Sequence, residues 1–203
     1  MKSVITDGKG KVELKEIRDP QPNSHQCLCR IDACATCTGT DKKLVNGQMA
    51  WANKYPAILG HESFGTVIQC GRDVRNIKPG DRFLRPAAAY PWTLLDGYAS
   101  WMGGFSEYGL VTDTKALQED NPSAVIHPYC VYQQLIPPEI SIEAADATML
   151  VTLKEIASTL RDLDIKFGSK VVVLGTGAVG MSMCYFAKLC GAYPVISVGR
   201  RDQ

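Results

Sequence analysis

The chain has 203 residues, of which 45% are apolar, and its 22 basic side chains nearly balance its 21 acidic ones. This balance lacks the concentrated positive charge that binds nucleic acids or anionic membranes. No apolar run approaches the roughly 20 residues that span a bilayer, and the first residues lack the apolar core of a signal peptide. We therefore expect a cytoplasmic globular protein that binds small molecules, with no nucleic-acid or membrane partner.

Eight cysteines are scattered along the chain: Cys27, Cys29, Cys34, Cys37, Cys70, Cys130, Cys184 and Cys190. In a short secreted chain such a number would indicate a disulfide framework, but in a longer chain without a signal peptide it favours free thiols and metal ligation. Cys27 and Cys29 alternate with Leu28 and Arg30, which is the two-residue period of a strand. We expect these two to be small core or surface residues and not ligands.

The first two-thirds of the chain predicts many short strands separated by turns. Residues 11–17 alternate polar and apolar side chains, as a half-buried strand does. A tight turn is predicted at Lys78-Pro79-Gly80-Asp81, with proline and glycine at its central positions. Further strands are expected up to residue 31 and over 57–59, 64–70, 82–84 and 108–111, with a short helix over 42–46. Such a pattern indicates a β-barrel-like domain.

Gly60-His61-Glu62 is the most informative segment of this domain. Imidazole and carboxylate are both zinc ligands, and glycine lets the backbone pass close to whatever the pair holds. A histidine beside a glutamate is, by itself, more typical of a solvated turn. Three further motifs favour a metal site: Cys37-Thr38-Gly39-Thr40-Asp41, Pro79-Gly80-Asp81-Arg82 and Gly103-Gly104-Phe105-Ser106-Glu107-Tyr108.

The order of these motifs resembles that of the zinc-dependent medium-chain dehydrogenases, the alcohol and polyol dehydrogenase family, from about Val12 to the end of the chain. The resemblance implies a mixed β and α/β fold, in which a GroES-like β-barrel-type catalytic domain precedes a Rossmann domain. It also implies an oxidoreductase that transfers a hydride between an alcohol, polyol or sugar and NAD(P).

By the same resemblance, Cys37 and His61 are the first two ligands of one catalytic zinc, and Glu62 is a neighbour able to bind or exchange. A hydroxyl relays the proton of the substrate alcohol. The family spacing is one residue shorter than that of Cys37-Thr38-Gly39-Thr40-Asp41, so Thr38 and Thr40 both qualify, and Thr40 is favoured because it precedes Asp41. The predicted catalytic residues are thus Thr40, Cys37 and His61.

The sequence departs from the family where the last zinc ligand is expected, near Leu150-Val151-Thr152, which contains no ligand. Asp146 and Glu155 are the nearest substitutes, and Cys34 is a rival because Cys-x-x-Cys is itself a zinc spacing. The family's structural zinc needs four clustered cysteines, and residues 85–115 contain none. We therefore expect one catalytic zinc and no structural zinc.

A helix is predicted between Ile140 and Leu163, with Ser141 as its N-cap and apolar positions at helical spacing. The change from strands to helix marks the predicted domain boundary. Residues 1–150 form the catalytic domain, and residues 151–203 form a linker helix and an incomplete Rossmann domain.

An apolar strand from Val171 runs into Gly175-Thr176-Gly177-Ala178-Val179-Gly180, followed by a helix that ends at Gly191 and by a second strand, Val195–Val198. A Gly-x-Gly-x-x-Gly motif between a strand and a helix is typical of dinucleotide binding, because the glycines admit the pyrophosphate to the helix N-terminus. Gly175, Gly177, Ala178, Val179 and Gly180 are the predicted contacts.

The end of the second strand reads Gly199-Arg200-Arg201, where NAD enzymes usually carry an acidic residue for the ribose hydroxyls. A guanidinium pairs with a 2′-phosphate, which a carboxylate would repel. The predicted cofactor is therefore NADP, held by Gly199, Arg200 and Arg201. Asp202 leaves NAD open as the alternative.

A dinucleotide domain has two halves, and the residues after Gly168 suffice for one. We therefore expect a chain that is truncated relative to a full-length enzyme, which would be a homo-oligomer. Two alternatives remain: a zinc-free reductase of the same superfamily, and a catalytically inactive binding module. Zinc content separates the first alternative from a dehydrogenase, and turnover excludes the second.

Overall fold

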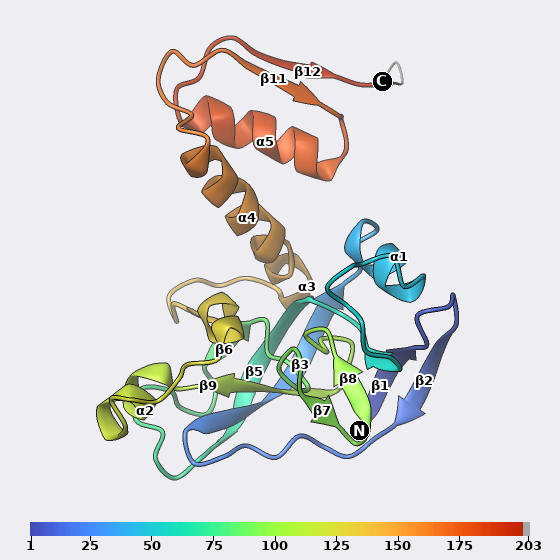
Figure 1. Ribbon diagram of the computed structural model, residues 1–203. Helices are drawn as coiled ribbons and strands as arrows, with labels where there is room; N and C mark the ends of the chain where they lie inside the picture. Colours follow the sequence, from blue (N-terminus) through green and yellow to red (C-terminus); the bar gives the residue numbers. More distant parts are fainter. Residues whose placement is uncertain (201–203) are drawn as a thin grey trace. The chain divides into compact units, whose positions relative to one another are not determined.

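The computed structural model describes residues 1–200, and these fold as two compact units that divide between Thr148 and Met149. The first unit is built mainly of strands, and the second contains two helices and two strands (Figure 1). Among the described residues no helix is long and apolar enough to cross a membrane.

The first unit contains two five-stranded sheets with the strand orders β2-β1-β4-β8-β7 and β10-β6-β5-β3-β9. The strands of the first sheet are β1 (Lys2–Thr6), β2 (Val12–Glu16), β4 (Ala57–Ile58), β7 (Leu94–Leu95) and β8 (Tyr98–Ser100). Those of the second are β3 (Gln26–Ala35), β5 (Glu62–Cys70), β6 (Arg82–Leu84), β9 (Tyr108–Thr112) and β10 (Gln134–Ile136). Its helical segments are α1 (Thr40–Val45), α2 (Thr114–Asp120), η1 (Pro128–Tyr132) and α3 (Ala144–Ala147).

The two longest strands, β3 and β5, pair antiparallel at the centre of the second sheet (Figure 1). Their register runs from Cys27 opposite Cys70 at one end to Ala35 opposite Glu62 at the other. Cys27 and Cys29 are fully buried, as the alternation in this segment predicts for core residues. Glu62 and the end of β3, which leads to Cys37, therefore lie at the same end of the strand pair.

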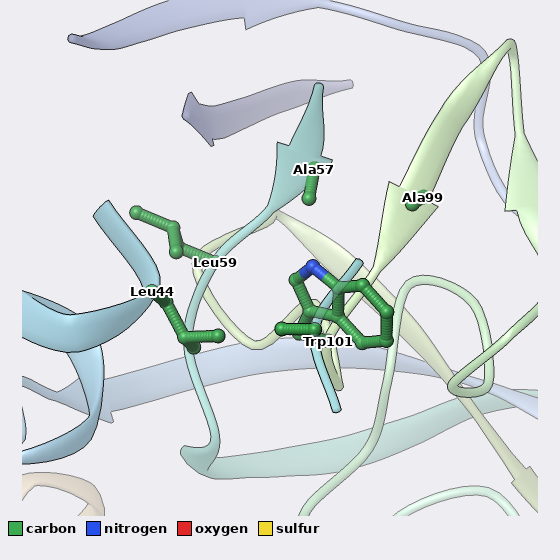
Figure 2. Packing of buried hydrophobic residues seen from close by; sticks show 6 residues of the cluster. Leu44, Ala57, Leu59, Ala99 and Trp101 are labelled. Atoms are coloured by element: carbon green, nitrogen blue, oxygen red, sulfur yellow. The ribbon is translucent and has the colours of Figure 1, made fainter. Parts of the chain in front are cut away.

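One apolar cluster of the first unit centres on Trp101, which is fully buried. Figure 2 shows its indole among Leu44, Ala57, Leu59 and Ala99, which come from α1, β4 and the segment after β4, and β8. The cluster joins residues that are distant in sequence. Trp101 can contact all of them because an aromatic side chain buries a large apolar area.

The second unit consists of α4 (Met149–Asp162), β11 (Val171–Leu174), α5 (Ala178–Leu189) and β12 (Val195–Val198). The two strands pair in parallel, with Val171 opposite Val195 and Leu174 opposite Val198. The core between α4 and α5 contains Ile156, Leu160, Ala187 and Ala192. The predicted strand, helix and strand around the glycine-rich motif are confirmed.

The prediction of one helix capped by Ser141 is wrong. Helix α3 begins at Ala144 after an extended Glu143 and makes no side-chain cap hydrogen bond. It ends at Ala147, and α4 begins at Met149. The hydroxyl of Thr148 donates to the Ala145 carbonyl at 2.6 Å, where the two helices divide. Local apolar spacing does not reveal such a break.

The buried Trp101 gives a direct test of the packing in the first unit. Replacing it with alanine should lower the free energy of unfolding by about 3–5 kcal/mol, because the lost contacts leave a cavity. Trp92→Ala is the matched control, since Trp92 is 56% exposed and its loss should cost less than about 1 kcal/mol. Chemical denaturation followed by circular dichroism measures both, and equal losses would contradict the packing.

Candidate metal and cofactor sites

His61 and Glu62 lie where the chain passes from β4 into β5, and both side chains are buried. The pairing of β3 with β5 places Glu62 opposite Ala35 and Ser63 opposite Cys34. The segment that follows β3, which carries Cys37, therefore begins beside the start of β5.

Gly60 allows this turn because two backbone segments meet at it. Its φ is +93°, and a Cβ there would lie 2.3 Å from the Phe105 nitrogen. Backbone N–H groups of Gly104 and Phe105 donate to the carbonyls of Gly60 and Leu59, at 2.8 and 2.9 Å. Any larger residue would push the Gly103-Gly104-Phe105 segment away from His61.

Cys37, His61 and Glu62 come together, as the sequence predicts for a metal site. Their ligand atoms all lie within 4.8 Å of one another, and they are the one grouping of three or more His, Cys, Asp or Glu ligands among residues 1–200. His61 is 7% exposed and Glu62 9%, while Cys37 is half-buried. The grouping thus has two shielded ligands and one nearer the surface.

The donor set fits zinc. One thiolate, one imidazole and one carboxylate are ligands of a borderline-soft cation, and three protein ligands with one open position are typical of catalytic zinc. Zinc bonds of about 2.0–2.3 Å place ligand atoms roughly 3.5 Å apart. The ligand atoms here lie within 4.8 Å of one another, so small side-chain rotations would bring them to that distance.

Asp41 joins two of the three candidate ligands, a role that the sequence did not reveal. Its Oδ2 accepts the Cys37 backbone N–H at 2.8 Å, and its Oδ1 lies 3.2 Å from His61 Nδ1. Neither Asp41 Oδ1 nor His61 Nδ1 has a hydrogen-bond partner of full geometry among the described residues, so the contact between them is electrostatic. Because Nδ1 faces the carboxylate, Nε2 is the nitrogen available to a metal.

These contacts also shift the protonation of both ligands. Burial opposes the charged form of His61, yet the Asp41 carboxylate outweighs it and raises the pKa of the imidazole. Burial likewise opposes the Cys37 thiolate, but the backbone N–H and hydroxyl of Thr40 and the His61 ring lower the pKa of the thiol. The lowered pKa of the Cys37 thiol eases formation of the thiolate, the metal-binding form of cysteine. The raised pKa of the imidazole means that a proton competes with a metal at His61.

Thr40 is the first residue of α1, and its hydroxyl contacts Cys37. Thr38, the alternative for the proton relay, is exposed. Cys34 is half-buried at the end of β3 and lies outside the grouping of three. Near the expected last ligand, Leu150-Val151-Thr152 contains no residue of a zinc-ligand type, and Val151 is buried in α4. Both substitutes are exposed: Asp146 and Glu155.

The second unit has a cleft of about 700 Å³ at the ends of β11 and β12, lined by Leu174, Gly175, Thr176, Gly177, Val198, Gly199 and Arg200. Gly175 has φ +122°, which other residues rarely adopt, and a Cβ on Gly180 would lie 2.1 Å from the Gly175 carbonyl oxygen. Gly177 is the N-cap of α5, and no neighbouring atom lies within 4 Å of where its Cβ would stand. An anion can therefore approach the free N–H groups of this helix end.

Of the predicted NADP contacts after β12, Gly199 lies against Thr176, since its Cβ would meet the Thr176 hydroxyl at 2.7 Å. Arg200 lines the cleft. Ala178 and Val179 begin α5 beside Gly177. Arg201 and Asp202 lie outside the described residues.

Comparisons with known proteins agree with this fold. Residues 23–120 match the alcohol dehydrogenase GroES-like domain. The NADP-dependent isopropanol dehydrogenase of Thermoanaerobacter brockii is 32% identical over 95% of this chain and 54% of its own length. Sorbitol dehydrogenase of Ovis aries is 24% identical over 96% of this chain and 54% of its own length.

Solved structures give the same result. A proposed zinc-binding dehydrogenase from Sinorhizobium meliloti with NADP bound superposes with a TM-score of 0.73 at 27% identity, over 98% of this chain and 56% of that one. Acetophenone reductase of Geotrichum candidum, in complex with NAD, has a TM-score of 0.74 at 20% identity, over 99% and 58% of the two chains. The second likeness concerns the fold alone.

The chain thus has an alcohol dehydrogenase GroES-like domain, and a glycine-rich β–α–β unit follows it in the sequence. The chain belongs to the medium-chain dehydrogenase family, as its motifs predict. It spans about half the length of the curated relatives that it matches.

Gly60 and Gly80 form a matched pair that separates backbone strain from collision. Their φ values are +93° and +92°, but a Cβ on Gly80 meets nothing within 4 Å. Gly80→Ala should cost about 1–2 kcal/mol for the left-handed conformation, and Gly60→Ala a further 1–3 kcal/mol or so for overpacking against Phe105. Thermal or chemical unfolding measures both, and equal losses would show that the close approach is absent.

The role of Asp41 predicts a loss of zinc affinity without a change of ligand. Asp41→Asn should weaken zinc binding by about 10–100-fold, because the carboxylate no longer orients the His61 ring. Asp162→Asn, which alters an exposed pair with Arg161, is the control. Competition with a chromophoric chelator measures both affinities, and an unchanged affinity in Asp41→Asn would contradict the role.

Proposed function

We propose that this protein is, or is part of, a zinc-dependent oxidoreductase that transfers a hydride between an alcohol, polyol or sugar and NADP. The observation that carries the proposal is the grouping of Cys37, His61 and Glu62, whose ligand atoms lie within 4.8 Å of one another. The glycine-rich cleft of the second unit supports the cofactor part of the proposal.

Cys37, His61 and Glu62 would hold the metal, and Asp41 would orient the imidazole. A zinc ion held there supplies Lewis acidity, which lowers the pKa of a bound alcohol and polarises the carbonyl of a bound ketone or aldehyde. The burial of His61 and Glu62 keeps their side chains from bulk water, which strengthens each electrostatic interaction at the site.

Thr40 would move the proton. Its hydroxyl contacts Cys37, and a hydroxyl both accepts and donates a hydrogen bond. It can therefore take the proton of an alcohol and pass it to solvent. Thr40→Val should lower the oxidation rate and leave the metal content unchanged.

The cleft beside Gly175 and Gly177 would receive the pyrophosphate of the dinucleotide, and Arg200 would pair with its 2′-phosphate. The bound nicotinamide supplies the hydride acceptor. The relatives from Thermoanaerobacter brockii and Clostridium beijerinckii are NADP-dependent isopropanol dehydrogenases, which supports NADP over NAD.

A second candidate is a zinc-free reductase or an inactive binding module. The absence of a ligand near Val151 favours it, and one relative is an acryloyl-coenzyme A reductase of Metallosphaera sedula at 28% identity. The metal grouping argues against it. Turnover that needs no zinc would favour the reductase, and zinc without turnover the binding module.

The test measures zinc content and NADP reduction with propan-2-ol, butane-2,3-diol and sorbitol as substrates. We expect about one zinc per chain and turnover that is lost on chelation and restored by zinc. His61→Ala should lower turnover at least a hundredfold or so, because a Lewis acid contributes several kcal/mol. His25→Ala, which removes a contact with Asp120 outside the metal grouping, should change neither. Full turnover in metal-free protein would overturn the proposal.

The cofactor preference is tested at Arg200. Arg200→Ala should weaken NADP binding by roughly 10–100-fold, because hydrogen bonds to charged groups contribute about 1.5–3 kcal/mol. NAD binding should stay the same. Arg161→Ala, at an exposed ion pair, is the control for lost charge. Calorimetric titration with each cofactor decides, and an equal loss for NAD and NADP would contradict the assignment.

A further inference from the structure

Two thiols face each other at the end of β3 and β5 that is remote from the metal grouping. Cys27 and Cys70 are direct partners in the strand register, and their Sγ atoms lie 3.3 Å apart. They are separated by 43 positions in the sequence. Cysteine spacing along the chain therefore gives no sign of the pair.

The backbone geometry at this pair suits a covalent bond. The Gly71 N–H donates to the Gln26 carbonyl at 2.8 Å, so the adjacent position is the hydrogen-bonded one and Cys27 opposite Cys70 is a non-hydrogen-bonded pair. Cα atoms at such a pair are about 4.5 Å apart, inside the range of roughly 4.4–6.8 Å found in disulfides. Side-chain rotation alone can bring the sulfurs together.

The two thiols differ in access. Cys27 is fully buried in a cluster with Cys29, Val67, Phe83 and Val111. Cys70 ends β5 and is half-buried. Because only Cys70 is partly exposed, it is the sulfur that a reagent in solution reaches first.

We propose that Cys27 and Cys70 form a reversible disulfide, a redox modification site that is independent of the proposed oxidoreductase function. The oxidant is a low-molecular-weight disulfide such as oxidised glutathione. The Cys70 thiolate attacks one sulfur of the oxidant and releases one thiolate. Cys27 then gives up its proton to the departing thiolate as its sulfur attacks the Cys70 sulfur, and the second thiol of the oxidant leaves. The protein pair loses two electrons and two protons, and the oxidant becomes two thiols.

The disulfide would link β3 and β5 covalently. β3 leads to Cys37 and β5 begins at Glu62, so the cross-link lies on the two strands that present the metal grouping. It closes a long loop, and oxidation should therefore raise the melting temperature by about 5–10 °C. A cross-link of this kind in a reducing compartment is transient and responds to redox conditions.

The test incubates the protein with oxidised glutathione, blocks remaining thiols, and maps its peptides without reduction. We expect one peptide pair joining Cys27 to Cys70, reversed by dithiothreitol. Cys190 is exposed, so its mixed disulfide with glutathione shows that the oxidant acted. A modified Cys190 without the Cys27–Cys70 bond overturns the proposal, as does a mixed disulfide that persists at Cys70.

Variants separate this pair from its neighbours. Cys70→Ser should abolish the cross-link and the rise in melting temperature, whereas Cys29→Ser, in the same cluster, should retain both. A bond from Cys70 to Cys29, or from Cys34 to Cys37, in place of the expected one would overturn the assignment. Mapping of the unsubstituted protein decides the question even where a variant fails to fold.

Discussion

The antiparallel pairing of β3 with β5 is the constraint on which the first unit depends. It begins at Cys27 opposite Cys70 and ends at Ala35 opposite Glu62, with register shifts after Leu28 and after Ile31. The pairing and its two irregularities together set the thiol pair at one end and the start of the metal grouping at the other. The strands approach so closely that a Cβ on Gly65 would lie 2.5 Å from the Arg30 carbonyl oxygen. A slip by one residue would turn every side chain of β5 to the opposite face and would separate Glu62 from the segment that carries Cys37.

Several motif residues serve this framework and not the chemistry. Gly103-Gly104-Phe105 packs on Gly60, and a Cβ on Gly104 would lie 2.8 Å from the Ser63 Cβ. The Glu107 carboxylate accepts the Lys2 N–H at 2.7 Å, and its backbone carbonyl accepts the Ile31 N–H. This motif therefore joins β1 and β3 near the metal grouping. The motif holds the backbone of the Gly-His-Glu turn in place, and a metal site needs ligands on a fixed backbone.

Local sequence patterns predicted the elements that have clear periodicity. Strands β2, β3, β5, β11 and β12 and helix α5 follow from alternation, helical spacing or glycine-rich turns. Strand β1, the β7–β8 hairpin and α2 were not predicted, and β7 and β8 contain only two and three residues. The same limit applies to Ser141, whose type suits an N-cap although the helix begins at Ala144.

The candidate site shows the same division. Cys37, His61 and Glu62 were indicated by motifs and family resemblance, and the fold brings them together. The contact of Asp41 with His61 was not, because it joins residues 20 positions apart through a turn that periodicity does not describe. The pairing of Cys27 with Cys70 was not predicted either, because it depends on the register between two strands. The family resemblance predicted the types of the site residues and their order in the sequence. Which of their side chains are in contact could be determined only from the folded structure.

X-ray absorption at the zinc edge of the purified protein tests the central claim most directly, because it counts the ligands by element. The arrangement of Cys37, His61 and Glu62 predicts one sulfur at about 2.3 Å and a remaining shell of nitrogen and oxygen at about 2.0–2.2 Å, with an imidazole signature. Two sulfurs would place Cys34 beside Cys37 as a ligand. A shell without sulfur would contradict the site altogether.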